Sequence, residues 1–515
     1  MPMTRPRRIQ IRNELGQTRT LASGPDQFGL LSPGMDSDSP LLVLGLGPAP
    51  EALADYAQGR NEIFFIESPD FVLQMLESRD DWRSAIPTAC RETMPRDLDP
   101  ALIRRSRIIA YRPIAKLFPS FWGPVLGKIR AALLASAPRP QEKTILLPGS
   151  ESDLLVPELR HAFKGAGYTV LAWDPGAADS EAAFAALLSG GAPRLFFCVN
   201  FRGLDPFGER FHTLRQAGTR VGVWCVDNPW HLVSGLKSPF WKEAALFVTD
   251  GSFLPSLRAH GADEAYHLPL AVWPELYRDS AKTQGEALGL ENRAVFVGRS
   301  AFPGKRGFFS GLKPDPGLME KAAQMLGQGI RGNFHWWTKQ LGISTLWPGT
   351  AVRQAGLGAE ETGLLLRTRM LEAVAGTFAL TVFGDPGWKD ILPPNADLRP
   401  PVDYYSTLPR IYGQSRYVLN ATSPLLPEGL TQRHFDVWAA GGLLVTDATP
   451  GLSLFPEELV RPVCFRRPGD IPALLASLEK GPRPDELVRD WQNHILAHHT
   501  YTRRVDTISN LLGLG

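Results

Sequence analysis

The chain has 515 residues, which is enough for several domains with buried cores. Hydrophobic residues make up 43% of it and charged residues 21%, the composition of a globular protein. Its 55 basic and 53 acidic residues leave a net charge of +2, which excludes a general electrostatic attraction to nucleic acid or membranes. No apolar run approaches the roughly 20 residues that cross a bilayer, so we expect no membrane span. The balanced charge leads us to expect no nucleic-acid partner.

The four cysteines are widely spaced and show no metal-binding pattern. Cys198 and Cys225 fall in apolar runs, which is typical of reduced thiols in a core. Basic residues near the start, among them Arg5 and Arg7, are not followed by an apolar segment, so we expect no secretory signal. These features favour a bacterial-type cytoplasmic enzyme without a metal.

The first part of the chain predicts an accessory domain. Residues 1–38 are polar and rich in turn-forming residues, and we expect an irregular N-terminal arm there. Residues 39–140 begin with an apolar strand at 41–47, a helix, and a second strand at 62–67, which is a βαβ-like unit of a Rossmann-like domain. The rest of this domain, from residue 71 onward, is expected to be largely helical.

A glycine turn ends the first of these strands. Gly45 and Gly47 form a Gly-x-Gly pattern, and Glu67 follows some twenty residues later, as in fingerprints for a nucleotide or S-adenosylmethionine. The third glycine is missing, and Pro48 and Pro50 lie in the turn. A degenerate Rossmann-like domain is favoured, and a methyltransferase activity of this domain is kept as an alternative.

Residues 143–285 predict a first doubly wound domain. Strand and helix patterns alternate along it, and such alternation gives a parallel sheet. Ligands of these sheets bind beyond the carboxyl ends of the strands. The residues at those ends are Pro148-Gly149-Ser150, Asn200, Asp227 to His231, and Asp250.

Asp227 and His231 are candidate catalytic residues at this edge. Either could act as the general base that takes the proton of an acceptor, and histidine titrates near neutrality. The alternative is an ordinary turn after the strand, with Asp227 as a cap and His231 hydrogen-bonded locally.

Residues 290–505 predict a second doubly wound domain. It opens with a strand at 293–297 and ends with a helix near 484–499. Between them, Trp336 and Trp337 form either a sugar-stacking platform or, as their helical context favours, part of the core.

The segment 419–447 is the most informative of the chain. It reads as a loop, a short helix and a buried strand. Glu428 lies in the loop next to Gly429, and Asp436 follows eight positions later, near the start of the helix. The helix ends at Gly441-Gly442, where a left-handed C-cap forms easily.

This layout resembles the donor site of GT-B glycosyltransferases, and the chemistry of their sugar-diphosphate donor gives reasons for it. The anion favours backbone N–H groups and a planar arginine fork, which Arg433 offers. Gly429 lets the backbone approach the ligand closely. Asp436 can accept two hydrogen bonds from ribose hydroxyls, while Glu428 orients the sugar or the loop. The alternative is a capped amphipathic helix with Asp436 as a solvated surface charge.

Together these motifs resemble the CgeB-like (spore maturation protein type) glycosyltransferases of bacteria over roughly residues 143–505. The segment 383–447 is similar to the nucleotide-sugar domain of that family, and 497–505 (Ala-His-His-Thr-Tyr-Thr-Arg-Arg-Val) is similar to its final helix. In the first domain, 224–230 and 267–271 are similar as well.

The resemblance implies a GT-B fold, in which two doubly wound Rossmann-like domains follow the N-terminal α/β accessory domain. It implies transfer of a sugar, of the hexosyl type, from a nucleotide diphosphate to a protein or surface-glycan acceptor, such as a flagellar, spore or cell-surface one. The nucleotide sugar is then a substrate, and no cofactor is implied. The alternative is a non-catalytic GT-B scaffold that binds a glycan or a partner.

The resemblance also assigns a cationic loop. Gly298-Arg299 and Lys305 are similar to the glycine-arginine and lysine-glycine pair of GT-B donor domains, whose cations neutralise the diphosphate leaving group. With these cations a metal is not needed. The alternative is an ordinary basic surface loop. Gly384, after its strand, either approaches the nucleobase or forms a plain turn.

Two positions depart from the family pattern. Asp436 stands where retaining GT-B enzymes usually carry a second glutamate, so its carboxylate reaches about one methylene less far. Thr431 stands where close relatives often have asparagine, and it still offers a hydroxyl to the donor.

Overall fold

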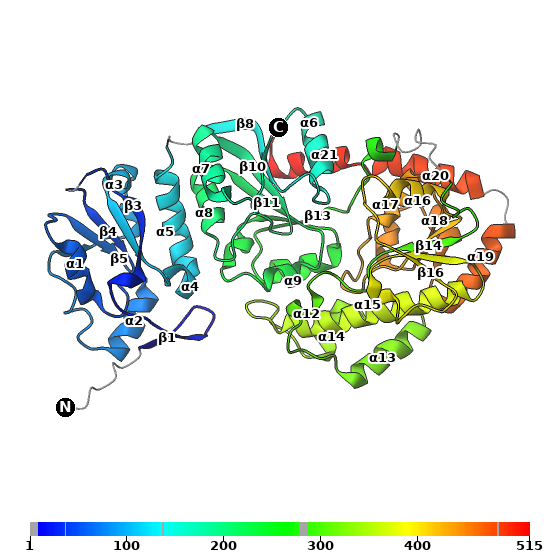
Figure 1. Cartoon of the computed structure of the whole chain (residues 1–515), viewed down its shortest axis with the longest axis horizontal. Coiled ribbons are helices and arrows are strands. Elements are labelled where there is room, and N and C mark those ends of the chain that lie inside the picture. The colour runs from blue at the N-terminus through cyan, green and yellow to red at the C-terminus, as the bar shows by residue number, and fades with distance from the viewer. Residues whose placement is uncertain (1–8, 37, 136–138, 278–286, 481–483, 515) are drawn as a thin grey trace. The chain divides into compact units, whose positions relative to one another are not determined.

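The computed structural model describes residues 9–36, 38–135, 139–277, 287–480 and 484–514. Its strands form a two-stranded hairpin and three sheets of five, six and six strands (Figure 1). The chain divides into two compact units, one made of Met1–Ser150, Thr169–Gly222 and Gly235–Ala244, the other of Glu151–Tyr168, Val223–Ser234 and Ala245–Gly515. Among the described helices, none combines the length and the apolar composition that crossing a bilayer requires.

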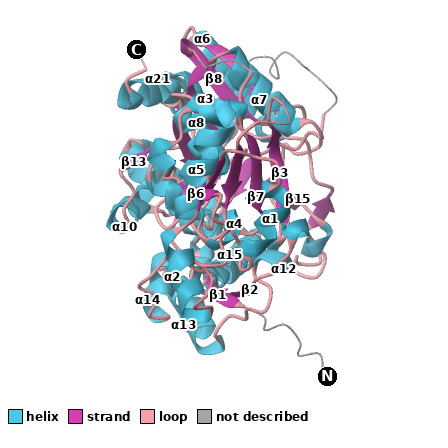
Figure 2. Cartoon of the chain, turned by 90° about the vertical axis from the view of Figure 1, so that its left-hand side faces the viewer, coloured by secondary structure: helices cyan, strands magenta, loops and turns pink. Residues whose placement is uncertain are grey.

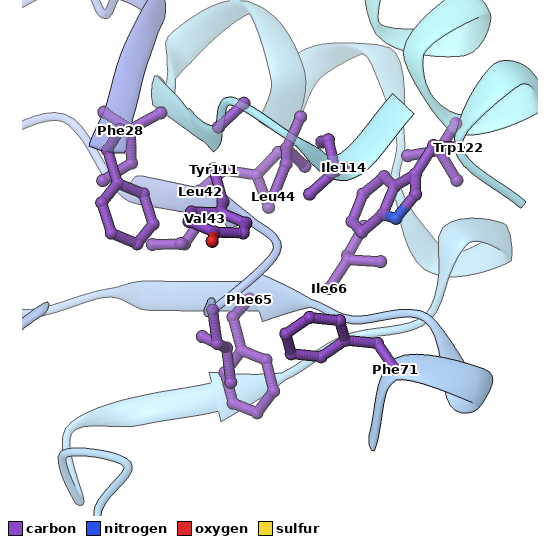
Figure 3. Packing of buried hydrophobic residues seen from close by; sticks show 14 of the residues in the cluster. Phe28, Leu42, Val43, Leu44, Phe65, Ile66, Phe71, Tyr111, Ile114 and Trp122 are labelled. Carbon is purple, nitrogen blue, oxygen red and sulfur yellow. The ribbon is translucent and has the colours of Figure 1, made fainter. Parts of the chain in front are cut away.

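The N-terminal domain is built on the five-stranded sheet. In sheet order its strands are β3 (Phe28–Pro33), β7 (Arg107–Tyr111), β4 (Leu41–Leu44), β5 (Ile63–Ile66) and β6 (Cys90–Glu92), and only β3 is antiparallel to its neighbour. Its helices are α1 (Ala54–Ala57), α2 (Pro69–Ser78), α3 (Pro100–Arg105), α4 (Ile114–Leu117) and α5 (Pro119–Ala132) (Figure 2). Every side chain of β4 is buried, as in a parallel strand covered on both faces, and Figure 3 shows the cluster around it.

Two segments of this domain differ from the expectation. The described part of the arm is not irregular, because β1 (Gln10–Arg12) and β2 (Thr18–Thr20) pair as a hairpin and β3 forms an edge of the sheet. The strands β6 and β7 lie inside the region expected to be helical. β6 has only three residues. β7 has five and directly follows the basic helix α3, so its local pattern does not separate it from that helix.

The glycine turn after β4 is filled by protein. The Glu67 carboxylate accepts hydrogen bonds from the N–H groups of Leu46 (2.7 Å) and Ser68 (2.8 Å). A Cβ at Gly47 would lie 3.1 Å from the Tyr111 ring, and the Trp82 indole donates to the Gly47 carbonyl at 2.9 Å. The turn that suggested a methyltransferase therefore has its acidic residue engaged and its surface covered.

The second sheet has the order β13-β12-β11-β10-β8-β9, and its recorded strand pairs are parallel. Its strands are β8 (Pro140–Pro148), β9 (Thr169–Trp173), β10 (Ala192–Val199), β11 (Arg220–Cys225), β12 (Ala245–Val248) and β13 (Glu264–His267). Its helices are α6 (Val156–Gly165), α7 (Ser180–Gly190), α8 (Glu209–Gln216), α9 (Pro229–Val233) and α10 (Leu254–Ala259). The chain winds outward from β8 in both directions, which is a doubly wound order.

The third sheet is entirely parallel, with the order β16-β15-β14-β17-β18-β19. Its strands are β14 (Ala294–Val297), β15 (Leu380–Phe383), β16 (Asp397–Arg399), β17 (Tyr417–Asn420), β18 (Leu444–Asp447) and β19 (Cys464–Phe465). Between β14 and β15 run α12 (Lys305–Phe308), α13 (Pro316–Gly327), α14 (Phe334–Gln340) and α15 (Val352–Ala375). Figure 1 shows α13 and α14 beside the long helix α15.

The remaining helices follow β16 in the chain. They are α16 (Leu408–Gln414), α17 (Arg433–Ala439), α18 (Glu457–Val460), α19 (Ile471–Lys480), α20 (Pro484–His498) and α21 (Tyr501–Leu512). The fold class expected from the sequence is confirmed, with two Rossmann-like doubly wound sheets and a further N-terminal α/β domain. The strand order of the third sheet reverses between β14 and β17, and such switch points are where these sheets bind ligands.

Candidate functional site

A cavity of about 700 Å³ lies in the second unit, at the switch point of the third sheet. The loop after β14 and the loop after β17 both contribute to its wall, and so does the loop after β11. Its lining includes Leu154, Asp227, Asn228, His231, Phe296, Gly298, Arg299, Phe302, Phe308, Glu360, Arg367, Leu425, Thr431 and Arg433. Of the residues predicted from the sequence, six meet here: Asp227, His231, Gly298, Arg299, Thr431 and Arg433.

The loop after β14 is fixed from two sides. A Cβ at Gly298 would lie 2.9 Å from Arg433 Nη2 and 3.0 Å from the Phe296 ring, so only glycine fits beneath these side chains. Asp385 accepts hydrogen bonds from the N–H (2.7 Å) and the hydroxyl (2.7 Å) of Ser300. These contacts hold Arg299, which is solvent-exposed, at the rim of the cavity.

Arg433 begins α17 and reaches back over the end of β14. Its Nε donates to the Val297 carbonyl at 3.0 Å, and its Nη1 donates to Asn420 Oδ1 at 3.0 Å. The guanidinium lies over the Phe296 ring, 5.3 Å from its centroid. Its plane is therefore held in place before any ligand arrives, which lowers the entropic cost of binding.

A buried polar network supports Arg433 from behind. Asn420 accepts from the Thr431 hydroxyl at 3.0 Å and donates to the Thr446 hydroxyl at 3.0 Å. The Nδ1 atom of His434 accepts the Thr431 N–H at 3.0 Å. Burial lowers the pKa of His434 to about 3, so its imidazole is neutral at pH 7 and adds no charge behind the guanidinium.

One face of α15 forms another wall of the cavity. Gly356, Glu360, Gly363 and Arg367 recur on this face at helical spacing, and both charged side chains line the cavity. A Cβ at Gly356 would overlap the His231 ring. No motif predicted Glu360 or Arg367. Their shared helical face was the signal that could have found them.

The loop after β11 supplies a further part of the lining, next to α15. Asn228 caps α9 by accepting the N–H groups of Trp230 (2.9 Å) and His231 (3.2 Å). Its amide donates to the Leu425 carbonyl at 2.8 Å, which ties the loop after β17 to this strand end. Asp227, the residue before this cap, lines the cavity.

His231 has an apolar environment. Its ring centroid lies 5.2 Å from that of Phe308, 5.8 Å from Phe309 and 6.0 Å from Phe334. Its Nε2 is buried without a hydrogen-bond partner among the described residues. This burial lowers the pKa of His231 to about 3, so the side chain is neutral at pH 7.

Five predicted site residues lie outside the lining: Glu428, predicted as catalytic, and four predicted as donor-binding. Their assigned roles stay predictions. The side chain of Glu428 is exposed, and its N–H donates to Asp250 Oδ2 at 2.9 Å. Lys305 lies 2.9 Å from the Glu361 carboxylate. Gly429 follows Glu428 and is buried, while Gly384 lies under the Trp388 ring.

The fifth is Asp436, which is only 1% exposed. Its carboxylate accepts the Tyr404 hydroxyl at 2.7 Å and the Gln432 amide at 2.9 Å. Burial raises the pKa of Asp436 to about 6. The alternative of a solvated surface charge is therefore wrong, and a ribose contact would require this carboxylate to exchange its present partners.

Arg331 was missed by sequence reasoning and holds the loop after β17. It lies 3.1 Å from the Asp447 carboxylate and donates to the Pro427 carbonyl at 3.0 Å. Asp447 also accepts the Thr422 N–H at 2.7 Å. Among the described residues, no group of three or more His, Cys, Asp or Glu side chains is arranged to hold a metal ion.

The chain was compared with known proteins. A family model described as Glycosyl transferase-like matches residues 367–510. The comparison with curated proteins gave no match.

Several solved structures are distantly similar. Anabaena Alr3699/HepE in complex with UDP and glucose has a TM-score of 0.42 and 10% identity over 72% of this chain and 99% of that one. A UDP-forming trehalose-phosphate synthase from Burkholderia xenovorans has a TM-score of 0.38 and 11% identity, with the same coverage of 72% and 99%. A DNA-modifying β-glucosyltransferase has a TM-score of 0.41 and 8% identity, again over 72% and 99%. The residues that match the Glycosyl transferase-like model, 367–510, include Arg367, Thr431 and Arg433.

Proposed function

We propose that the chain is a glycosyltransferase that moves a sugar from a nucleotide diphosphate to a protein or surface-glycan acceptor. The observation that carries this proposal is the convergence of Arg299, Arg367 and Arg433 on one cavity at a sheet switch point. Two of these arginines lie among the residues that match the Glycosyl transferase-like model. Three guanidinium groups suit a diphosphate, which offers paired anionic oxygens to planar forks.

In this mechanism the cations act on the leaving group. Cleavage of the bond from sugar to diphosphate leaves negative charge on the diphosphate, and fixed cations that face it lower the barrier. Arg433 is already oriented by Val297 and Asn420, so little reorganisation is needed. We propose that these side chains supply the stabilising charge and that no cofactor takes part.

Asp227 is the residue to which we assign the acceptor proton. It lines the same cavity, as a general base must if it is to reach the acceptor hydroxyl. His231 suits this role less well, because its Nε2 faces Gly356 and its pKa of about 3 disfavours the imidazolium ion. The hexosyl type of transfer, the CgeB-like family, the bacterial source and the cytoplasmic location belong to the same proposal and rest on the motifs.

A thermal-shift screen with UDP, GDP, dTDP, CMP and their sugars tests the proposal. A ligand at 100 times its Kd raises the free energy of unfolding by about 2.7 kcal/mol, so one nucleotide should raise the Tm of the wild type. Arg299→Ala and Arg433→Ala should remove this shift, whereas Arg489→Ala, an exposed arginine on α20, should keep it. A wild type that no nucleotide stabilises would sink the proposal.

A further inference from the structure

Helix α15 carries a charged pair inside the cavity wall. Glu360 and Arg367 lie two turns apart on one helix face, and their side chains are only 6% and 13% exposed. The Arg367 Nη2 atom lies 3.6 Å from Glu360 Oε1. Burial of two opposite charges at this separation leaves each incompletely compensated, because the pair lacks a short hydrogen bond.

Arg367 has hydrogen-bonding capacity left over. Its Nη2 donates to the Ser300 carbonyl at 3.1 Å, while its Nε is buried without a partner among the described residues. Burial lowers the pKa of Arg367, and the charge of Arg433 lowers it further, because the two guanidinium groups are near enough to repel each other. Two facing cations with an unused donor make a site that an anion would stabilise.

Glu360 is an anion beside Arg367, and it is loosely held. Its carboxylate also faces Lys305 Nζ, at 4.0 Å, while Lys305 makes its closer contact of 2.9 Å to Glu361. Burial raises the pKa of Glu360, which shows that its cations do not fully offset the loss of solvent. This carboxylate therefore acts as a counter-ion that a stronger anion can replace.

We propose that Arg367 binds a phosphate group of the ligand, and that Glu360 is the counter-ion it gives up when the ligand binds. The ligand class is a pyrophosphate-containing anion. Its identification as a nucleoside diphosphate rests on the proposed function. Its anionic chemistry rests on the geometry of Arg367, Glu360 and Arg433 alone.

Titration calorimetry of the full chain with three probes tests the proposal. The probes are inorganic pyrophosphate, the nucleoside diphosphate that stabilises the wild type, and the matching nucleoside. Arg367→Gln should weaken binding of both phosphate probes at least ten-fold, about 1.4 kcal/mol, and leave nucleoside affinity unchanged. Glu360→Gln should tighten binding of the phosphate probes several-fold, because a competing carboxylate is removed. Arg489→Gln, the exposed control on α20, should match the wild type.

Two results would overturn the proposal. Unchanged phosphate affinity in Arg367→Gln overturns the proposal, and so does a Glu360→Gln variant that binds as weakly as Arg367→Gln, because Glu360 would then position the arginine. If Arg367→Gln does not fold, Arg367→Lys is used, which keeps the charge and loses the fork. A several-fold loss supports the proposal, and no loss overturns it. If the wild type binds pyrophosphate but no nucleotide, the proposed function is wrong and this inference is supported. If the wild type binds neither, both are wrong.

Discussion

Two buried carboxyl groups of the second unit, Asp436 and Glu158, lie in a cluster of tyrosines. Tyr404 donates to Asp436 at 2.7 Å, and Tyr405 donates to Glu158 at 2.9 Å. Both acids are 1% exposed. Burial raises the pKa of Asp436 from an ordinary value of 3.8 to about 6, and that of Glu158 from 4.5 to about 7. The folded state therefore binds protons at pH values where the unfolded chain has released them.

This difference predicts how stability depends on pH. Since the folded pKa values of these two acids lie above the unfolded ones, their contribution to the free energy of unfolding should fall as pH rises from about 4 to about 7. The lowered pKa values of His231 and His434 give a contribution of the opposite sign up to about pH 6.5, so the part due to the acids has to be measured as a difference between variants. The loss is complete above the folded pKa values. For Glu158 it amounts to up to about 3 kcal/mol, at 1.36 kcal/mol per pKa unit. The difference in Tm between the wild type and a variant that lacks one of the acids, measured in a buffer series from pH 5 to pH 8, checks this contribution.

Glu158→Gln isolates one of the two groups. The amide does not titrate, so the Tm of Glu158→Gln should rise relative to that of the wild type between pH 5 and pH 8. Glu457→Gln, which changes an exposed acid on α18, should leave the slope unaltered. Equal slopes in all three proteins would show that Glu158 titrates normally in the folded state.

Single residues were predictable where a local pattern decides their place. Arg299 and Thr431 follow strand ends and Arg433 begins a helix, and all three line the cavity. Asp436 has an equally clear local position, but Tyr404, which lies 32 positions earlier, takes its carboxylate. Such long-range hydrogen bonds have no local signal, so the sequence places the backbone of Asp436 better than its side chain.

At the scale of elements, α15 is organised by its glycines. A Cβ at Gly356 would overlap the His231 ring, one at Gly358 would overlap the Trp337 ring, and one at Gly363 would lie 2.9 Å from Pro424. Trp337 is buried and donates to the Thr362 hydroxyl at 3.2 Å, which fits its core interpretation. The sequence gives only a weak signal for this 24-residue helix, because glycine lowers helix propensity. The tertiary contacts of the glycines explain why they are there.

The variant Gly356→Ala distinguishes the gain in helix propensity from the steric cost of packing a methyl group against His231. In an open helix the change stabilises by about 1 kcal/mol, but here the methyl group must displace His231. We expect a net destabilisation of about 1–3 kcal/mol, the usual cost of overpacking, measured by chemical denaturation. Gly165→Ala is the matched control, because nothing lies within 4 Å of a Cβ at that helical glycine. A Gly356→Ala protein as stable as Gly165→Ala would show that His231 moves freely.

At the scale of the whole molecule, the two large sheets were predictable and the first was only partly so. Alternating strand and helix patterns with carboxyl-end turns mark the second and third sheets, and both are doubly wound. In the N-terminal domain, β3 is an antiparallel edge strand outside the repeating βα pattern, and β7 is a short strand that comes directly after α3. The glycine turn resembled a ligand site locally, and only the packing of Tyr111, Trp82 and Glu67 shows that the protein fills it.

This packing predicts that the chain has no S-adenosylmethionine site in its N-terminal domain. Each oxygen of the fingerprint acid already accepts one backbone N–H, from Leu46 or Ser68, and the side chain is buried, so ribose hydroxyls have little access to it. Calorimetry should give no saturable heat with S-adenosylmethionine. Glu67→Gln should lower the Tm. The amide NH2 group would then face a backbone N–H group whose hydrogen bond a carboxylate oxygen of Glu67 now accepts, and that bond would be lost. Saturable binding in the wild type that Glu67→Gln abolishes would instead make this turn a second ligand site and restore the methyltransferase reading.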